Sequence, residues 1–183
     1  MSITPFNVSG SPELNKFDKD KRWWSTPYTA DNKFFSGFSH VNLSGVGCPE
    51  LGSIIVSASA GDLDVDYTHY GSAMSEEKAH PGYYSVQLDK HKIKAEVTAT
   101  QRTAVSAFTF ERGGKSNILV NLGLGLTNES GATVRFLNDS TIVGSKLMGT
   151  FCYAPQAVFN QYFAIRISRR APASGYWKKQ PPM

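Results

Sequence analysis

The chain has 183 residues, enough for one ordinary domain with a sizeable core. With 40% hydrophobic and 12% aromatic residues, the composition excludes a disordered chain, and the many Gly, Ser and Thr residues favour an all-β fold. The net charge of +4 is spread along the chain and partly offset by acidic residues, which favours a solvated surface and speaks against a nucleic-acid partner.

The first half of the chain begins without regular structure. Residues 1–36 are predicted to form an irregular, aromatic-containing loop segment, because they are rich in Asn, Ser, Pro and charge. Short β-like runs then recur, beginning with Ser53–Ser59. Tyr83–Asp89 alternates between apolar and polar residues, and Ile93–Thr100 follows after three residues, so these two runs are expected to form a hairpin. A single helical turn is expected at Met74–Ala79.

The second half continues in the same way. Val105–Glu111 and Asn117–Leu122 flank residues 112–115, which contain Gly and are predicted to form a turn. Three later runs complete the series: Thr133–Leu137, Thr141–Met148 and Tyr162–Ser168. Short runs of this composition, separated by turn residues, indicate a β-sandwich or barrel over residues 37–170. The Pro-rich tail, residues 171–183, is predicted to leave the sheet.

The sequence gives little evidence of a membrane-spanning segment, a secretory signal or a required disulfide. No stretch approaches the roughly 20 apolar residues of a membrane span, and residues 1–15 lack the basic start and apolar run of a secretory signal. The two cysteines, Cys48 and Cys152, either pair in an oxidising compartment or stay as buried thiols, and neither has metal-site spacing.

Three patterns could carry chemistry but favour plain structural roles. Asp62, Asp64 and Asp66 alternate as calcium ligands do, yet the glycine and glutamate of a helix–loop–helix calcium loop are missing, so an exposed strand edge is expected. Residues 123–125 lack the third glycine of a dinucleotide loop and are expected to form a strand bend or bulge. Glycoside hydrolysis needs two carboxylates, and the candidates are strand-face residues that the sequence does not bring together: Glu76, Glu77, Glu96 and Glu111.

Trp23 and Trp24 are more suggestive. An aromatic ring can present a flat apolar face to a sugar while neighbouring polar groups bind its hydroxyls. The two residues lie in polar sequence, where burial in a core is less assured. The alternative is a loop held to the domain by its aromatic side chains, and composition alone leaves both open.

The segment Gly37–Cys48, with the sequence GFSHVNLSGVGC, resembles the signature of glycoside hydrolase family 92, GFSHTHLSGTGC. A second block, PGYYSVQLD at residues 81–89, and a third, AEVTATQR at residues 95–102, agree with that family in order and spacing. A weaker match is Tyr162–Ser168. Several blocks in the right order make this resemblance far more specific than any one motif.

The resemblance implies a truncated N-terminal domain with an antiparallel β-sandwich of the galactose-mutarotase-like supersandwich kind. Members of the family are calcium-dependent, inverting exo-α-mannosidases that act on N-glycans or mannans. Their acid, base and calcium ligands lie in a larger (α/α)₆ domain, which is missing here, so no catalytic or metal residue is carried over. The resemblance also implies a secreted, periplasmic or cell-surface bacterial enzyme, with α-mannoside glycans and the missing (α/α)₆ domain as partners.

Five substrate-binding residues are carried over. Trp23 and Trp24 precede the signature where the family has aromatic residues near the leaving-group sugar, and His40, Ser44 and Gly45 belong to the signature itself. His40 either donates a hydrogen bond to a ligand or packs structurally. Val41 and Asn42 replace the usual Thr and His, which weakens any sugar contact expected there.

Two other functions remain as alternatives. A free-standing carbohydrate-binding module would use Trp23 and Trp24 as its sugar platform, and a nucleic-acid-binding β domain would use basic and aromatic residues. The leading hypothesis is a non-catalytic fragment that contributes to the substrate pocket of an α-mannosidase and supports its catalytic domain.

Overall fold

The structure is a computed structural model that describes residues 3–6, 33–42, 51–125, 128–149, 154 and 156–178. The fold is all-β and antiparallel, as predicted, with one single-turn helix, α1 (Tyr67–Tyr70), in the described part. The chain forms two compact units that divide between Leu126 and Thr127, so the predicted body of residues 37–170 spans both. No helix among the described residues has the length and hydrophobicity to cross a lipid bilayer.

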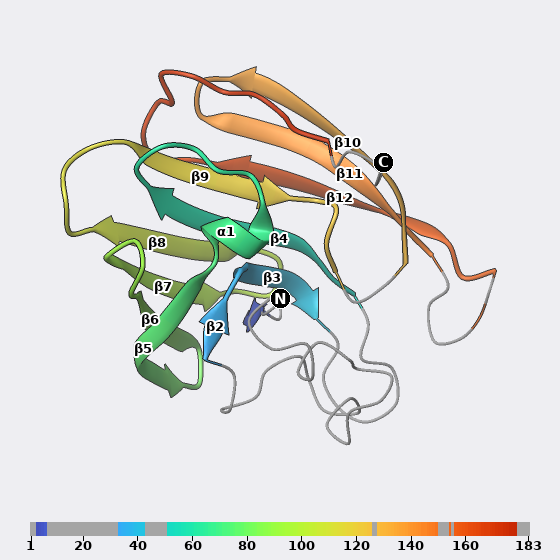
Figure 1. The fold of residues 1–183 in the computed structure, drawn as a ribbon. Helices are drawn as coiled ribbons and strands as arrows, with labels where there is room; N and C mark the ends of the chain where they lie inside the picture. The colour runs from blue at the N-terminus through green and yellow to red at the C-terminus, as the bar shows by residue number, and fades with distance from the viewer. Residues whose placement is uncertain are drawn as a thin grey trace. The chain divides into compact units, whose positions relative to one another are not determined.

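The first unit contains two sheets (Figure 1). The four-stranded sheet has the order β1-β3-β4-β9 and comprises β1 (Ile3–Phe6), β3 (Gly37–Asn42), β4 (Leu51–Ala60) and β9 (Ser116–Asn121). The five-stranded sheet has the order β2-β5-β6-β7-β8 and comprises β2 (Phe34–Phe35), β5 (Ser72–His80), β6 (Tyr83–Leu88), β7 (Ile93–Ala99) and β8 (Ala104–Phe110).

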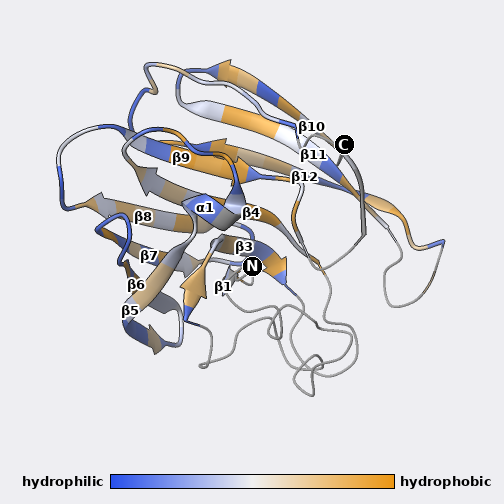
Figure 2. Ribbon diagram, viewed as in Figure 1, coloured by the Kyte–Doolittle hydropathy of each residue, from blue (hydrophilic) through white to orange (hydrophobic). Residues whose placement is uncertain are grey.

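The hydrophobic core of the first unit lies between these two sheets. Side chains from β2, β3, β4, β6 and β7 form one cluster of buried residues. Phe38 of β3 sits near its centre, with its ring edge-on to Phe35 at 5.0 Å and to Tyr84 at 6.0 Å between centroids. Figure 2 shows the alternation of hydrophobic and hydrophilic residues along the strands, the pattern of a sheet with one face in the core.

Strand β4 is covered on both of its faces, as is its neighbour β3. Every residue from Leu51 to Ser59 is buried. Ala58 belongs to the core cluster, while Ser57 and Ser59 alternate with it on the opposite face. At this end of the strand, small side chains therefore fill the space on both faces.

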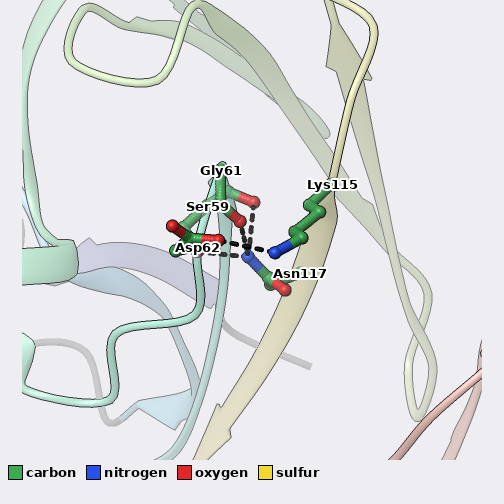
Figure 3. Close-up of polar contacts among 5 residues, drawn as sticks. All are labelled: Ser59, Gly61, Asp62, Lys115 and Asn117. Carbon is green, nitrogen blue, oxygen red and sulfur yellow. Dashed lines mark hydrogen bonds and ion pairs between the residues drawn. The ribbon is translucent and has the colours of Figure 1, made fainter.

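The end of β4 is held to the start of β9 by a polar clamp (Figure 3). The Asn117 side-chain amide donates to the Gly61 carbonyl at 3.1 Å and to the Ser59 hydroxyl at 3.3 Å. Lys115 pairs with Asp62 at 2.6 Å, and the Gly61 amide donates to the Lys115 carbonyl at 2.9 Å. These contacts satisfy backbone groups at the point where the chain leaves β4.

The second unit is a three-stranded sheet with the order β10-β11-β12. It comprises β10 (Asn128–Asn138), β11 (Thr141–Gly149) and β12 (Phe159–Arg166). The chain after β12 returns to the β10–β11 turn, where the Ile167 amide donates to the Ser140 carbonyl and the Ala171 amide to the Asp139 carbonyl. The Tyr176 ring then stacks on Phe136 at 5.9 Å, and residues 171–178 of the tail form no strand.

Several local predictions are confirmed. The runs from Ser53 onward correspond to strands, and β6 and β7 form the predicted hairpin with Leu88 opposite Ile93. Residues 112–115 connect two strands, but β8 and β9 belong to different sheets. Gly123 lies in a bend directly after β9, as predicted.

Other predictions are wrong. Met74–Ala79 lies within strand β5, because pairing with β6 overrides the helix propensity of its residues. The range 1–36, predicted to be irregular, contains β1 and β2. Asp62, Asp64 and Asp66 lie in the loop between β4 and α1 instead of on a strand edge.

Candidate functional site

The signature segment is only partly described, and it begins as strand β3. Gly37–Asn42 runs antiparallel to β4, with Phe38 opposite Val56 and His40 opposite Ile54. The other predicted site residues lie outside the described residues: Trp23, Trp24, Ser44 and Gly45. The same is true of both cysteines, so their predicted alternatives stay as predictions.

Gly37 opens the signature at a position where a side chain does not fit. Its φ of 151° lies in the range that L-residues rarely adopt. A Cβ there would lie 2.4 Å from Ile55 Cγ2 and 3.0 Å from the Val56 carbonyl oxygen. The glycine thus allows β3 to approach β4 closely.

His40 packs inside the domain. Its side chain is buried, and Nδ1 lies 2.6 Å from the Ile54 carbonyl oxygen. Because a carbonyl oxygen can only accept a hydrogen bond, Nδ1 must carry the proton. Burial lowers the pKa of His40 below its ordinary value, and hydrogen bonds to the Ile54 and Phe38 backbone oppose this only in part. At neutral pH the ring is therefore neutral and bound to the neighbouring strand.

The strand pairing is irregular immediately after His40. Asn42 pairs with Leu51, so Val41 opposes both Gly52 and Ser53 in a bulge. Val41 has a φ of 57° and Leu51 a φ of 73°, values that are costly for residues with a side chain. A strained bulge thus sets the direction in which the chain leaves β3 toward the rest of the signature.

Asn42 closes this irregular end with hydrogen bonds to its own strand. Its Nδ2 donates to the Ser39 carbonyl at 3.0 Å, and its Oδ1 accepts from the Ser39 hydroxyl at 3.2 Å. Both side chains are buried. The asparagine that replaces the usual histidine of the signature therefore stabilises the bulge through its amide.

Three of the four candidate glutamates accept hydrogen bonds from different partners. Glu77 accepts from the Tyr84 hydroxyl at 2.7 Å, and Glu111 accepts from Gln87 at 2.6 Å. Glu96 accepts from the Tyr83 hydroxyl and from Lys94, and these contacts hold its pKa below the usual range. A general acid for glycoside cleavage needs a raised pKa, so Glu96 does not suit that role.

The aspartates of the β4–α1 loop are engaged as well. Asp62 pairs with Lys115, while Asp64 accepts from the Asp66 amide at 2.9 Å and lies 3.2 Å from His69 Nδ1. No group of three or more His, Cys, Asp or Glu side chains among the described residues is placed to hold a metal ion.

The sequence did not point to Tyr70, which anchors the β4–α1–β5 loop. Its buried hydroxyl accepts from Asn121 Nδ2 at 3.2 Å, and its carbonyl accepts from His91 Nε2 at 2.8 Å. Burial raises the pKa of this tyrosine. The partners are distant in sequence, so no local pattern could have revealed the contact.

The geometry defines a class: an all-β antiparallel domain whose signature strand carries a buried, neutral histidine and ends in a strained bulge. Residues 5–183 match the family model for the glycosyl hydrolase family 92 N-terminal domain. The chain belongs to that family. No curated protein sequence matches it.

Solved structures agree with this assignment. The family GH92 α-mannosidase BT3965 from Bacteroides thetaiotaomicron, solved alone and with mannoimidazole, matches 92% of this chain with 27% identity and a TM-score of 0.76. The GH92 glycosyl hydrolase ccman5 shares the fold over 88% of the chain, with 22% identity and a TM-score of 0.62. In each case this chain spans only 22% of the length of the solved protein.

Proposed function

We propose that this chain is the non-catalytic N-terminal sandwich of a longer α-mannosidase that hydrolyses terminal α-mannosides of N-glycans or mannans. The observation that carries the proposal is the family match over residues 5–183, together with coverage of only 22% of a solved α-mannosidase. The sandwich contributes to the substrate pocket and supports an (α/α)₆ catalytic domain supplied by the remaining chain.

The carboxylate side chains are the reason for assigning catalysis to the other domain. Hydrolysis with inversion needs an acid and a base on opposite sides of the scissile bond. The described glutamates discussed above are bound to separate partners, and the described aspartates do not form a cation site. The acid, the base and the calcium ion therefore belong to the catalytic domain in this proposal.

The contribution to the pocket comes from the signature. The neutral His40, bound to β4, and the bulge beside Val41 hold the described end of the signature in place. Trp23 and Trp24, which precede the signature, supply the aromatic surface for the leaving-group sugar. Ser44 and Gly45 belong to the signature itself.

Turnover of an aryl α-mannoside in the presence of calcium tests the division of labour. We expect no turnover by the 183-residue chain. The longer protein, which includes the proposed catalytic domain, should hydrolyse the substrate, and chelation of calcium should abolish that activity. Turnover by the 183-residue chain alone would overturn the proposal. Fractionation of bacterial cells that express the extended protein tests the proposed secreted, periplasmic or cell-surface location.

Substitutions in the extended protein test the pocket role. Trp23→Ala or Trp24→Ala should raise KM for a mannobiose substrate about tenfold or more, because a stacking surface for the leaving-group sugar is lost. Trp177→Ala is the matched control, since Trp177 lies in the tail of the second unit and is 38% exposed. Equal effects of all three substitutions would contradict the assignment.

A further inference from the structure

The three-stranded sheet of the second unit has one exposed face with an ordered arrangement of side chains. Tyr162 of β12 lies opposite Ser145 of β11, which lies opposite Thr133 of β10. Because residues directly opposite one another share a face, these three form one row. The Tyr162 side chain is 77% exposed, and the Thr133 and Ser145 hydroxyls are 2.8 Å apart.

Two arginines lie on the same face. The next row contains Arg135, Val143 and Ala164, and the row after it contains Thr141 and Arg166. Tyr162 and Arg166 are four residues apart on one strand, about 13 Å. Arg135 lies two strands across and one row along from each of them, about 12 Å away. Val143 and Ala164 share the row of Arg135, so apolar side chains lie between Tyr162 and the two arginines on this face.

The opposite face of this sheet is the one used by the tail. Phe136 pairs with Ile142, which is buried, and the Tyr176 ring stacks on Phe136 from the tail. The face of Tyr162 and the two arginines is thus distinct from the tail-bearing face. Both arginines are exposed.

The charged side chains on this face are all positive. Among the described residues of its three strands, the face carries two arginines and no Asp or Glu. Asp139, in the β10–β11 turn, is the nearest acidic residue in sequence to either arginine. A guanidinium keeps its charge at all physiological pH values and binds oxyanions through paired N–H groups.

We propose that this face binds an anionic oligosaccharide, with Tyr162 stacked on a sugar ring and Arg135 and Arg166 bound to a phosphate, sulfate or carboxylate group on the glycan. The Thr133 and Ser145 hydroxyls form hydrogen bonds with hydroxyls of the sugar that stacks on Tyr162. A glycan ligand is suggested by the family to which the chain belongs. A negative charge on that glycan is suggested by the two arginines on the sheet face. The proposed site lies within the second unit and uses none of the residues assigned to the mannosidase pocket.

The test uses the ¹⁵N-labelled 183-residue chain with Val105→Lys, a substitution in β8 that opposes self-association through that exposed strand. This protein is titrated with mannobiose 6-phosphate, with unmodified mannobiose and with inorganic phosphate. We expect the phosphorylated disaccharide to bind most tightly, with resonance shifts centred on β12 and an affinity that falls as salt rises. Tyr162→Ala should weaken binding by about five- to tenfold. Arg135→Ala and Arg166→Ala should each weaken it by about tenfold and reduce the salt dependence.

Matched controls lie in the same unit. Tyr176→Ala removes another tyrosine of similar exposure, 75%, and Arg169→Ala removes an exposed arginine beyond β12. Both should leave the affinity unchanged. Equal binding of mannobiose and its phosphate, or equal effects of control and test substitutions, would overturn the proposal. Binding of inorganic phosphate or a glutamate-rich peptide as tight as that of the phosphorylated disaccharide, and insensitive to Tyr162→Ala, would also overturn it.

Discussion

At the scale of single residues, the burial of His40 links the stability of the domain to pH. The unfolded chain takes up a proton on this imidazole near the ordinary pKa of 6.5, whereas burial lowers the pKa in the folded chain. Below pH 6.5 the unfolded state therefore binds more protons than the folded state, and the free energy of unfolding falls as the pH falls.

Urea unfolding of the wild type and His40→Gln between pH 8 and about pH 5 measures this linkage. The substitution should flatten the pH dependence, because Gln can still donate to Ile54 but does not titrate. The carboxyl groups of Asp62 and Glu96 have pKa values held below 3.8 and 4.5, so their contributions are lost only at lower pH. An unchanged slope in His40→Gln would contradict the assignment.

Ser57 is a second residue with a measurable effect. Its hydroxyl is buried and has no hydrogen-bond partner among the described residues. Removing an unsatisfied buried hydroxyl costs no hydrogen bond, so Ser57→Ala should be neutral or stabilising by up to about 1 kcal/mol. Ser59→Ala, which removes an acceptor for Asn117, should cost about 1 kcal/mol. Chemical denaturation of the two variants distinguishes them, and a larger loss in Ser57→Ala would show that its hydroxyl has a partner.

At the scale of elements, β3 depends on the close approach of its first residue to β4. Gly37→Ala would place a Cβ against Ile55 and the Val56 backbone and should destabilise the domain by about 2–4 kcal/mol. Gly175→Ala is the control, because nothing lies within 4 Å of the Cβ that it would add. Thermal melting of both variants tests the prediction, and equal melting temperatures would contradict it.

Local sequence predicted elements well where the pattern was strong and failed where long-range pairing decided the outcome. The alternation of Tyr84, Val86 and Leu88 correctly placed β6 in a hairpin with β7. No local sequence pattern indicated that the chain passes from one sheet to the other at residues 112–115. Strand β1 was missed because it is short and contains Pro5, which is tolerated there because β1 lies at an edge of the described sheet.

The same contrast holds for the candidate site. His40 was identified from its place in the signature, but its hydrogen bond to Ile54 depends on a partner 14 residues away. Tyr162 and Arg166 share a strand phase that the sequence shows, whereas Arg135 joins them only through the register of two strand pairs. Residue type and spacing thus predicted candidates, and the pairing of strands defined their roles.

At the scale of the whole molecule, the chain spans 22% of a solved family member and presents strand edges that are unpaired among the described residues. Strand β8 has neighbours on one side only in that part of the chain, carries no charged residue, and leaves Val105 56% exposed. Edges of this kind promote association with other strands.

We therefore expect the 183-residue chain to self-associate at micromolar concentrations, as measured by sedimentation velocity. Val105→Lys should reduce this association, because a charged edge residue opposes strand pairing. Val158→Lys, at an exposed position before β12, is the control. A monodisperse wild-type monomer with a high melting temperature would contradict the expectation.

The two-sided burial of β4 also affects how this family member can evolve. With Ser53, Ser57, Ser59 and Ala58 packed on both faces, the strand has little room for added volume on either side. In a library of random substitutions, survival at these positions should follow side-chain size more closely than polarity, with Gly, Ala, Ser and Cys retained together. The most conserved part of the sandwich would then be the end of this strand, from Ser57 to Ser59, where all side chains are small.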